Sequence, residues 1–262
     1  MIFAKFFPIL KVIEFNIFKD TNMQEKILSQ AKQDTYDTGL RAYMQKIYNF
    51  MAIGLCITAL SSWLVANTSL IKLFFTITPE SATLSGLGWL ALIAPLIMVF
   101  AFSWVVQKGT PQQAQILFWS YAAIMGISLA PIFLLYTGSS ITRVFLISAG
   151  AFGGLSLWGY TTTRDLTGMG TFLRMGLWGL IIAMIVNIFL KSSGFDWALS
   201  IIGVVIFSGL TAYDTQNLKN IYHSQDNGET ITKKAIMGAL QLYLDFINLF
   251  IYLLRFFGER RQ

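Results

Sequence analysis

The sequence predicts an all-α membrane protein built as a bundle of seven transmembrane helices. Two observations support this prediction. Only 12% of the 262 residues are charged and 55% are hydrophobic, whereas a soluble domain carries about 25% charged residues. The apolar residues also gather in long charge-free runs, and a helix of about 20 apolar residues crosses the roughly 30 Å hydrocarbon core of a bilayer. The expected partner of most of the surface is therefore lipid.

Seven apolar runs follow one another along the chain. They cover residues 47–66, 81–107, 114–136, 144–163, 175–190, 197–213 and 235–254, and only the last is interrupted by a charged residue, Asp245. The fifth run is short, and Arg174 and Lys191 at its ends are expected to extend toward the membrane surface. The connecting loops leave no room for a soluble domain, so residues 46–262 are expected to form one transmembrane domain.

Residues 1–45 are expected to form an N-terminal arm outside the bundle. Within residues 1–22, Lys5, Lys11 and Glu14 interrupt the apolar pattern, so this stretch is too charged to span. No small-residue cleavage site follows it, which argues against a secretory signal. An interfacial helix and a translation start at Met23 both remain open. Residues 23–45 are polar and are expected to be a loosely ordered cytosolic arm.

Lysine and arginine accumulate on the cytoplasmic side of membrane proteins. With seven spans and a cytoplasmic N-terminus, 13 of the 19 basic residues fall on the cytoplasmic side. The distribution predicts that the N-terminus lies inside and the C-terminus outside, although Arg260 and Arg261 at the end of the chain would favour the inside.

Several functional classes are disfavoured by composition. The basic residues lie singly between apolar runs and form no stripe for nucleic acid, despite a net charge of +6. A single cysteine, Cys56, excludes an intramolecular disulfide and a cysteine zinc site, and the lone His223 supplies no histidine cluster. Without a Ser/His pair, a metal cluster or a phosphate loop, neither an enzyme nor a bound cofactor is expected.

Two aspartates in the last two spans are the most informative residues. The sixth apolar run is too short to cross the bilayer before Asp214, so its helix is expected to continue through Gln216 toward the Asn227-Gly228 turn. Asp245 lies in the middle of the seventh run. The two aspartates lie at similar distances from this turn, 14 residues before Gly228 and 17 residues after it, so an antiparallel hairpin is expected to bring them to about one level in the membrane.

An ionised carboxylate at such a depth costs roughly 2.5–3.5 kcal/mol on insertion scales, and two of them repel each other. Such a pair is expected to share one proton and to change charge within an accessible pH range. Its oxygens also suit a hard cation such as Ca²⁺. Two carboxylates fall short of the six to eight oxygens that Ca²⁺ prefers, so any Ca²⁺ site at Asp214 and Asp245 would be weak.

A simpler interpretation makes Asp214 an interfacial residue and Asp245 a permanently protonated contact between helices. The neighbouring polar residues Tyr213, Gln241 and Asn248 are expected to support the pair or to pack and hydrogen-bond between helices. Two membrane aspartates also resemble those of intramembrane aspartyl proteases. The Gly-x-Gly-Asp motif of that class is absent, because Tyr243-Leu244 precedes Asp245.

Four segments have distinctive sequences: FSGLTAYDTQ at 207–216, GALQLYLDFINLF at 238–250, GLRAYM at 39–44 and GYTTTRDL at 159–166. They resemble segments of the Bax inhibitor-1 family, the transmembrane Bax inhibitor motif proteins. The resemblance covers nearly everything after residue 35 and leaves residues 1–22 outside. It implies a seven-helix fold whose last helix is enclosed by the others. It also implies a di-aspartyl pH sensor, here Asp214 and Asp245, that gates a Ca²⁺ leak.

The family pattern can include a basic residue in the second span that holds the pair closed. Residues 81–107 contain no basic residue, and Lys108 lies at their end. Some bacterial relatives are instead tied to the regulation of a membrane-bound protease. The sequence thus leads to two hypotheses for a bacterial inner membrane: a pH-sensitive Ca²⁺ leak, or an interaction protein that modulates a membrane protease or quality-control partner, with residues 23–45 as its contact.

Overall fold

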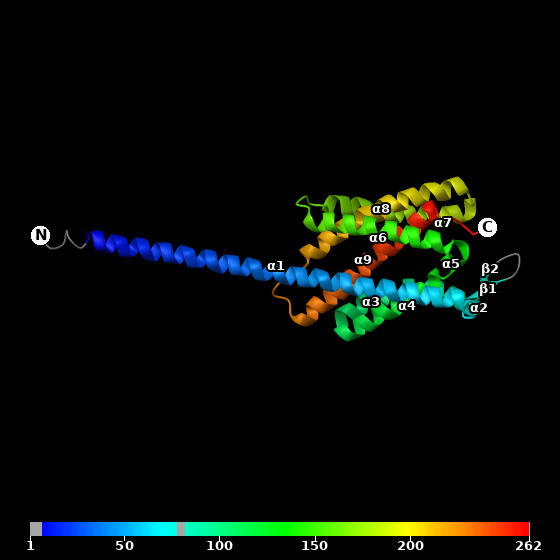
Figure 1. The fold of residues 1–262 in the computed structure, drawn as a ribbon, viewed down its shortest axis with the longest axis horizontal. Coiled ribbons are helices and arrows are strands. Elements are labelled where there is room, and N and C mark those ends of the chain that lie inside the picture. The colour runs from blue at the N-terminus through cyan, green and yellow to red at the C-terminus, as the bar shows by residue number, and fades with distance from the viewer. Residues whose placement is uncertain (1–6, 78–81, 262) are drawn as a thin grey trace. The chain divides into compact units, whose positions relative to one another are not determined.

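The computed structural model describes residues 7–77 and 82–261, with side chains for residues 36–76, 83–102 and 104–261. Helices make up nearly all of this part of the chain (Figure 1). In order, the elements are α1 (Phe7–Asn67), α2 (Ile71–Phe74), β1 (Phe75–Ile77), β2 (Ala82–Leu84), α3 (Gly86–Lys108), α4 (Pro111–Leu129), α5 (Pro131–Leu135), α6 (Gly138–Thr161), α7 (Thr167–Leu190), α8 (Ser193–Asn220) and α9 (Gly228–Phe257).

The chain divides into two units, residues 1–43 and 44–262. The backbone of the first unit is helical from Phe7 onward. The prediction of a loosely ordered arm at 23–45 was therefore wrong. Residues 23–38 contain no proline or glycine and are rich in Gln, Lys and Glu, which lose little side-chain freedom in a helix. The polar composition of residues 23–45 argues against a membrane span, but it does not determine whether their backbone is helical. Residues 1–6 lie outside the described part of the chain.

Within the described residues, seven helical segments are long and apolar enough to cross a membrane: Tyr36–Asn67, Gly86–Lys108, Pro111–Leu135, Gly138–Thr161, Thr167–Leu190, Ser193–Asn220 and Gly228–Phe257. The predicted seven-helix membrane fold is confirmed. As expected, α8 continues past Asp214 and ends at Asn220. The helices extend further than the charge-free runs because charged residues occupy their terminal turns.

Two local features were not predicted. The third span is divided into α4 and α5 at Pro131, whose missing amide hydrogen interrupts the helical hydrogen bonding. Before the second span, β1 and β2 form a short antiparallel pair in which Phe75 lies opposite Leu84. The second membrane helix consequently starts at Gly86, capped by the Ser85 hydroxyl, rather than at residue 81.

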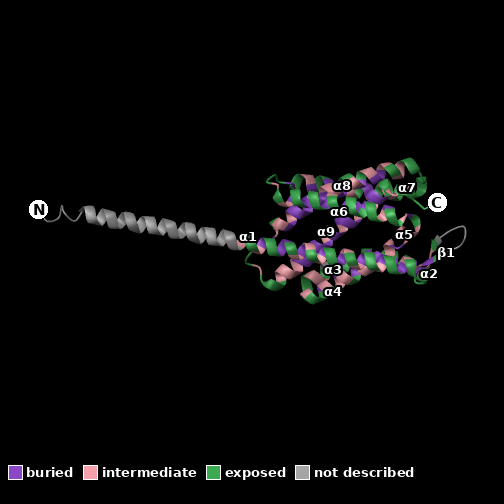
Figure 2. Ribbon diagram, viewed as in Figure 1, coloured by how far each residue is buried: buried purple, intermediate pink, exposed green. Residues whose placement is uncertain are grey.

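Helix α9 is enclosed by the others, packing against α3, α4, α6 and α8. In the most apolar 18-residue stretch of α9, 72% of the residues are buried, whereas the corresponding stretches of α7 and α3 are 11% and 18% buried. Many residues of the outer helices are exposed, whereas most residues of α9 between Ala235 and Leu254 are buried (Figure 2). Yet α9 has a lower mean hydropathy, 1.6, than α3, 2.3. Lipid-facing helices must be apolar, while an enclosed helix can carry polar groups that other helices satisfy.

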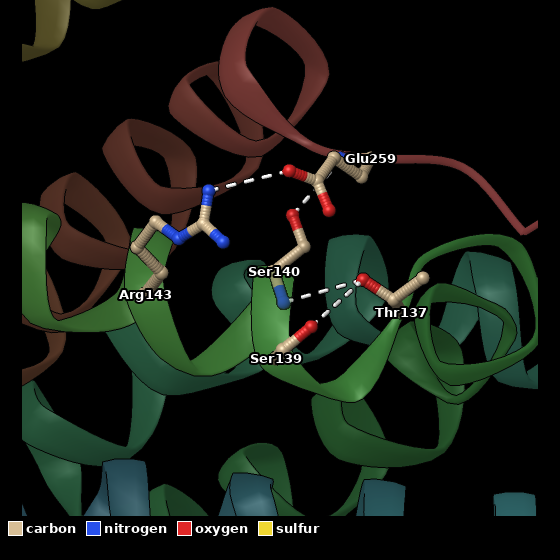
Figure 3. A network of polar contacts seen from close by, with 5 residues as sticks. All are labelled: Thr137, Ser139, Ser140, Arg143 and Glu259. Carbon is tan, nitrogen blue, oxygen red and sulfur yellow. Dashed lines mark hydrogen bonds and ion pairs between the residues drawn. The ribbon is translucent and has the colours of Figure 1, made fainter.

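The residues after α9 fasten its end to the start of α6. Tyr136 and Arg260 form an antiparallel bridge, and the Thr137 amide donates to the Glu259 carbonyl at 3.1 Å. The Glu259 amide donates to the Ser140 hydroxyl at 2.9 Å, and the Glu259 carboxylate lies 3.3 Å from the guanidinium of Arg143 (Figure 3). This C-terminal strap fixes the end of α9 that lies opposite the α8–α9 turn.

Close helix packing depends on particular glycines. Gly150 and Gly154 on α6 have the four-residue spacing that permits close approach, yet a methyl group at either would meet no atom within 4 Å. At Gly159, a Cβ atom would lie 2.2 Å from the Ala212 carbonyl oxygen of α8. The α6–α8 contact therefore requires glycine only at position 159.

We expect Gly159→Ala to destabilise the protein by about 1–3 kcal/mol, because the backbone of α8 must move to admit the methyl group. Gly154→Ala, the same change on the same helix, should be neutral or slightly stabilising, since alanine is the better helix former. Thermal unfolding of the purified variants in one detergent measures both. Equal melting temperatures for the two variants would contradict this role of Gly159.

Candidate functional site

The candidate site lies between α8 and α9, which form a hairpin around residues 221–227. Asn227 starts α9 by accepting a hydrogen bond from the Thr230 amide at 2.7 Å. Asp214 is on the part of α8 next to this turn, and Asp245 is inside α9. Both aspartates are buried, at 6% and 5% relative exposure. Neither is therefore a surface residue.

The side chains of Asp214 and Asp245 lie near enough to interact electrostatically. The Gln241 side chain also lies near Asp214. The Oδ2 atom of Asp245 is buried and has no hydrogen-bond partner among the described residues. Two carboxyl groups in direct contact repel if both are ionised and hydrogen-bond if one carries a proton. The arrangement can therefore hold one proton between α8 and α9.

Of the three supporting residues expected from the sequence, Gln241 lies near Asp214. Tyr213 contacts α7 instead, where its hydroxyl accepts a hydrogen bond from the Arg174 guanidinium at 3.1 Å. Asn248 donates to the Leu244 carbonyl of its own helix at 2.8 Å. Gln241 and Asn248 lie four residues before and three residues after Asp245, so helical spacing puts both near its face of α9 and does not by itself decide which of them approaches Asp214.

Arg174 was not foreseen as part of the site. Its guanidinium lies over the Tyr213 ring, 5.2 Å from the centroid, and it interacts electrostatically with Asp214. Gly170 makes this possible, because a Cβ atom there would lie 2.4 Å from the Tyr213 ring. The expectation that Arg174 ends the fifth span was wrong. The uncharged residues 166–173 indicate that the helix starts earlier, at Thr167, which places Arg174 two turns inside it.

Hydroxyl and amide groups hold the surrounding segments against α8. The Tyr48 hydroxyl is 2.6 Å from that of Ser156, which is 2.9 Å from the Thr215 hydroxyl beside Asp214. Gln216 accepts from the Leu166 amide at 2.9 Å and donates to the Arg164 carbonyl at 2.8 Å. These bonds tie α1, α6 and the α6–α7 loop to the segment of α8 that carries Asp214.

The α6–α7 loop also contains Asp165, a residue outside the membrane spans. Its carboxylate accepts hydrogen bonds from the hydroxyl and the backbone amide of Thr167, at 2.6 and 2.9 Å. These bonds lower the pKa of Asp165 below its ordinary value. Asp165 is therefore ionised at neutral pH.

No group of three or more His, Cys, Asp or Glu side chains that could hold a metal ion occurs among the residues described. Asp214 and Asp245 could offer at most a few oxygens to Ca²⁺, together with carbonyl groups and water.

The fold and the buried carboxyl pair define a class: polytopic helical membrane proteins with ionisable groups inside the bundle. The family model described as inhibitor of apoptosis-promoting Bax1 (Bax1-I) matches residues 40–262. The chain belongs to this Bax inhibitor-1 family. The predicted resemblance is confirmed.

Relatives occur across bacteria. An uncharacterized protein of Rickettsia prowazekii is 46% identical over 236 residues, 90% of this chain and 97% of the relative. The inner membrane protein YbhL of Escherichia coli strain K12 is 46% identical over 226 residues, 85% of this chain and 94% of YbhL. An uncharacterized protein of Borreliella burgdorferi is 43% identical over 238 residues, 90% of this chain and 98% of the relative. The similarity thus extends over nearly the full length of these relatives.

Proposed function

We propose that this protein is a pH-sensitive Ca²⁺ leak of a bacterial inner membrane, gated by Asp214 and Asp245. The observation that supports this most is the proximity of two buried carboxyl groups on neighbouring membrane helices, which interact electrostatically. Ionisable residues inside a membrane bundle are costly and mark ion or proton pathways. The inner-membrane location is inferred from YbhL, which is described as an inner membrane protein.

The proposed gate follows from the charge of the pair. With one shared proton, the pair carries one negative charge and a hydrogen bond joins α8 to α9. Loss of that proton places two negative charges in contact within a poorly screened interior, where like charges repel strongly. The repulsion loosens the contact between the helices. The carboxylates freed in this way are hard oxygen ligands, which a Ca²⁺ ion prefers.

Flux through the purified protein tests the proposal. The full chain is reconstituted into liposomes loaded with Ca²⁺, and release is followed from acidic to alkaline pH. We expect release to rise with pH above the rate for empty liposomes. Release at the empty-liposome rate at every pH would contradict a leak, and would favour an interaction protein that acts on a membrane protease or another quality-control partner.

Arg174 should tune the pH response. Its positive charge favours the ionised form of nearby Asp214, so Arg174→Gln should move the midpoint of Ca²⁺ release to higher pH. Because Arg174 is exposed, its charge is partly screened, and the expected shift of the midpoint is at most about one pH unit. Arg164→Gln, a change in the exposed α6–α7 loop, should leave the midpoint unchanged. A midpoint that stays fixed in Arg174→Gln would exclude this role.

Topology gives a further prediction. Seven candidate crossings and the excess of basic residues on one side support a cytoplasmic location for residues 23–45 and the opposite side for Gln262. A membrane-impermeant thiol reagent should label a cysteine substituted at Gln262 from outside the cell, in a Cys56→Ser background. A cysteine at Gln33 should stay unlabelled until the membrane is opened. The reverse labelling pattern would contradict the proposed orientation.

A further inference from the structure

An apolar cavity of about 80 Å³ lies between α1, α4, α5, α6 and α9. Its lining is almost entirely carbon, supplied by side chains such as Leu55, Phe145, Phe246 and Phe250. The rim includes Phe145 and Ala59, whose side chains are exposed on the membrane-facing side of the bundle. In a bilayer, the medium that meets such an opening is the acyl chains of lipids. An apolar cavity open to lipid therefore admits a hydrocarbon chain.

One polar group in the cavity lacks a partner. Ser62 lines the cavity at 3% relative exposure, and its hydroxyl has no hydrogen-bond partner among the described residues. The other hydroxyl, that of Thr58, is fully engaged with the Ala122 carbonyl at 2.8 Å and the Tyr243 hydroxyl at 2.6 Å. A buried donor without a partner costs about 1–3 kcal/mol. A ligand that brings one acceptor beside a hydrocarbon chain would satisfy it.

We propose that this cavity binds one acyl chain of a bilayer phospholipid, with its ester carbonyl accepting a hydrogen bond from Ser62. Ser62 lies five residues before the end of α1 at Asn67, about 7.5 Å along the helix axis. This places the hydroxyl near the end of the span, where the acyl chains meet their ester groups. A free fatty acid fits less well, because its carboxylate would lose hydration on burial, whereas an ester is neutral.

The cavity is too small for a whole lipid. At about 80 Å³ it is smaller than the ~150 Å³ engineered cavities that hold a benzene molecule. It therefore takes the upper part of one chain, while the rest of the lipid stays in the bilayer. Phe246 and Ile247 line the cavity directly after Asp245, so a bound chain contacts the turn of α9 that carries the buried carboxyl.

Photolabelling tests the assignment. The full chain in liposomes is exposed to a phospholipid with a photoreactive group in its acyl chain, and labelled peptides are identified by mass spectrometry. We expect label on residues 246–250, lost at least in large part in Ala59→Phe, which fills the mouth. Ala52→Phe, the same change at an exposed site on α1 outside the cavity, should keep the label. Equal labelling in the wild type and Ala59→Phe would overturn the proposal.

A second measurement remains decisive if Ala59→Phe does not fold. Unlabelled ester and ether phospholipids compete against the photoreactive lipid, and only the ester carries the carbonyl acceptor. The wild type should prefer the ester about threefold, the value of an average hydrogen bond within a membrane. Ser62→Ala should remove that preference. No ester preference in the wild type, or competition by free fatty acid but not by phospholipid, would overturn the assignment.

Discussion

Asp214→Asn and Asp245→Asn should each abolish most of the pH dependence of Ca²⁺ release from liposomes. Asparagine keeps nearly the volume and hydrogen-bonding capacity of aspartate but cannot ionise, so either change removes the pair's ability to acquire two negative charges. The double variant should lose little more than either single variant, because the two groups act as one titrating unit. Release profiles measured across pH at matched protein content test this non-additivity.

The control for these variants is Asp165→Asn. Asp165 is an aspartate of the exposed α6–α7 loop with its own hydrogen bonds to Thr167, so its removal should leave the release profile intact. Asp214→Ala and Asp245→Ala should also lower stability, since each leaves the partner unsatisfied in the interior. Two asparagine variants with wild-type pH profiles would exclude the pair as the gate.

Tyr243→Ala should be the most destabilising single substitution in α9 that leaves the aspartates in place. Tyr243 is fully buried. Its ring makes edge-on contacts with Phe118 and Tyr121, each with centroids 5.9 Å apart, and its hydroxyl is 2.6 Å from that of Thr58. Truncating a buried aromatic residue costs about 3–5 kcal/mol. Tyr243→Phe should cost only about 1 kcal/mol, the contribution of the hydrogen bond.

Phe257→Ala provides the matched comparison, because Phe257 lies on the same helix at 53% exposure. Denaturant or thermal unfolding of the three variants in one detergent should give the order Tyr243→Ala, Tyr243→Phe, Phe257→Ala, from least to most stable. A Tyr243→Ala protein as stable as Phe257→Ala would contradict the central place of Tyr243 in the packing of α9.

The sequence predicted the membrane fold because crossing a bilayer imposes a length and a composition that are visible without coordinates. The hairpin symmetry used to predict Asp214 and Asp245 at one level is not found, because Asp214 lies six residues before the end of α8 and Asp245 lies 17 residues after the start of α9. The sequence could not show that Gln241 turns toward the pair while Asn248 bonds to its own helix. That difference depends on the rotation of α9, which neighbouring helices set through packing.

Arg174 illustrates a second feature that the sequence did not predict, the position of a charged residue inside a membrane helix. Charge-free runs mark the minimum length of a span, so a charged residue near a helix end is easily placed outside it. Here Gly170 admits the Tyr213 ring, and the ring in turn positions the guanidinium. A contact between residues on different helices cannot be predicted from the local sequence of either helix. The cavity beside Ser62 is hidden for the same reason, because five helices contribute to its lining.

The shared proton between Asp214 and Asp245 is the central claim, and infrared spectroscopy of the protein in liposomes tests it most directly. A pH titration should reveal a protonated-carboxyl stretching band that is absent from both Asp214→Asn and Asp245→Asn. The band should disappear over the pH range in which Ca²⁺ release rises. A band that persists unchanged while release rises, or release that rises without any such band, would contradict the account.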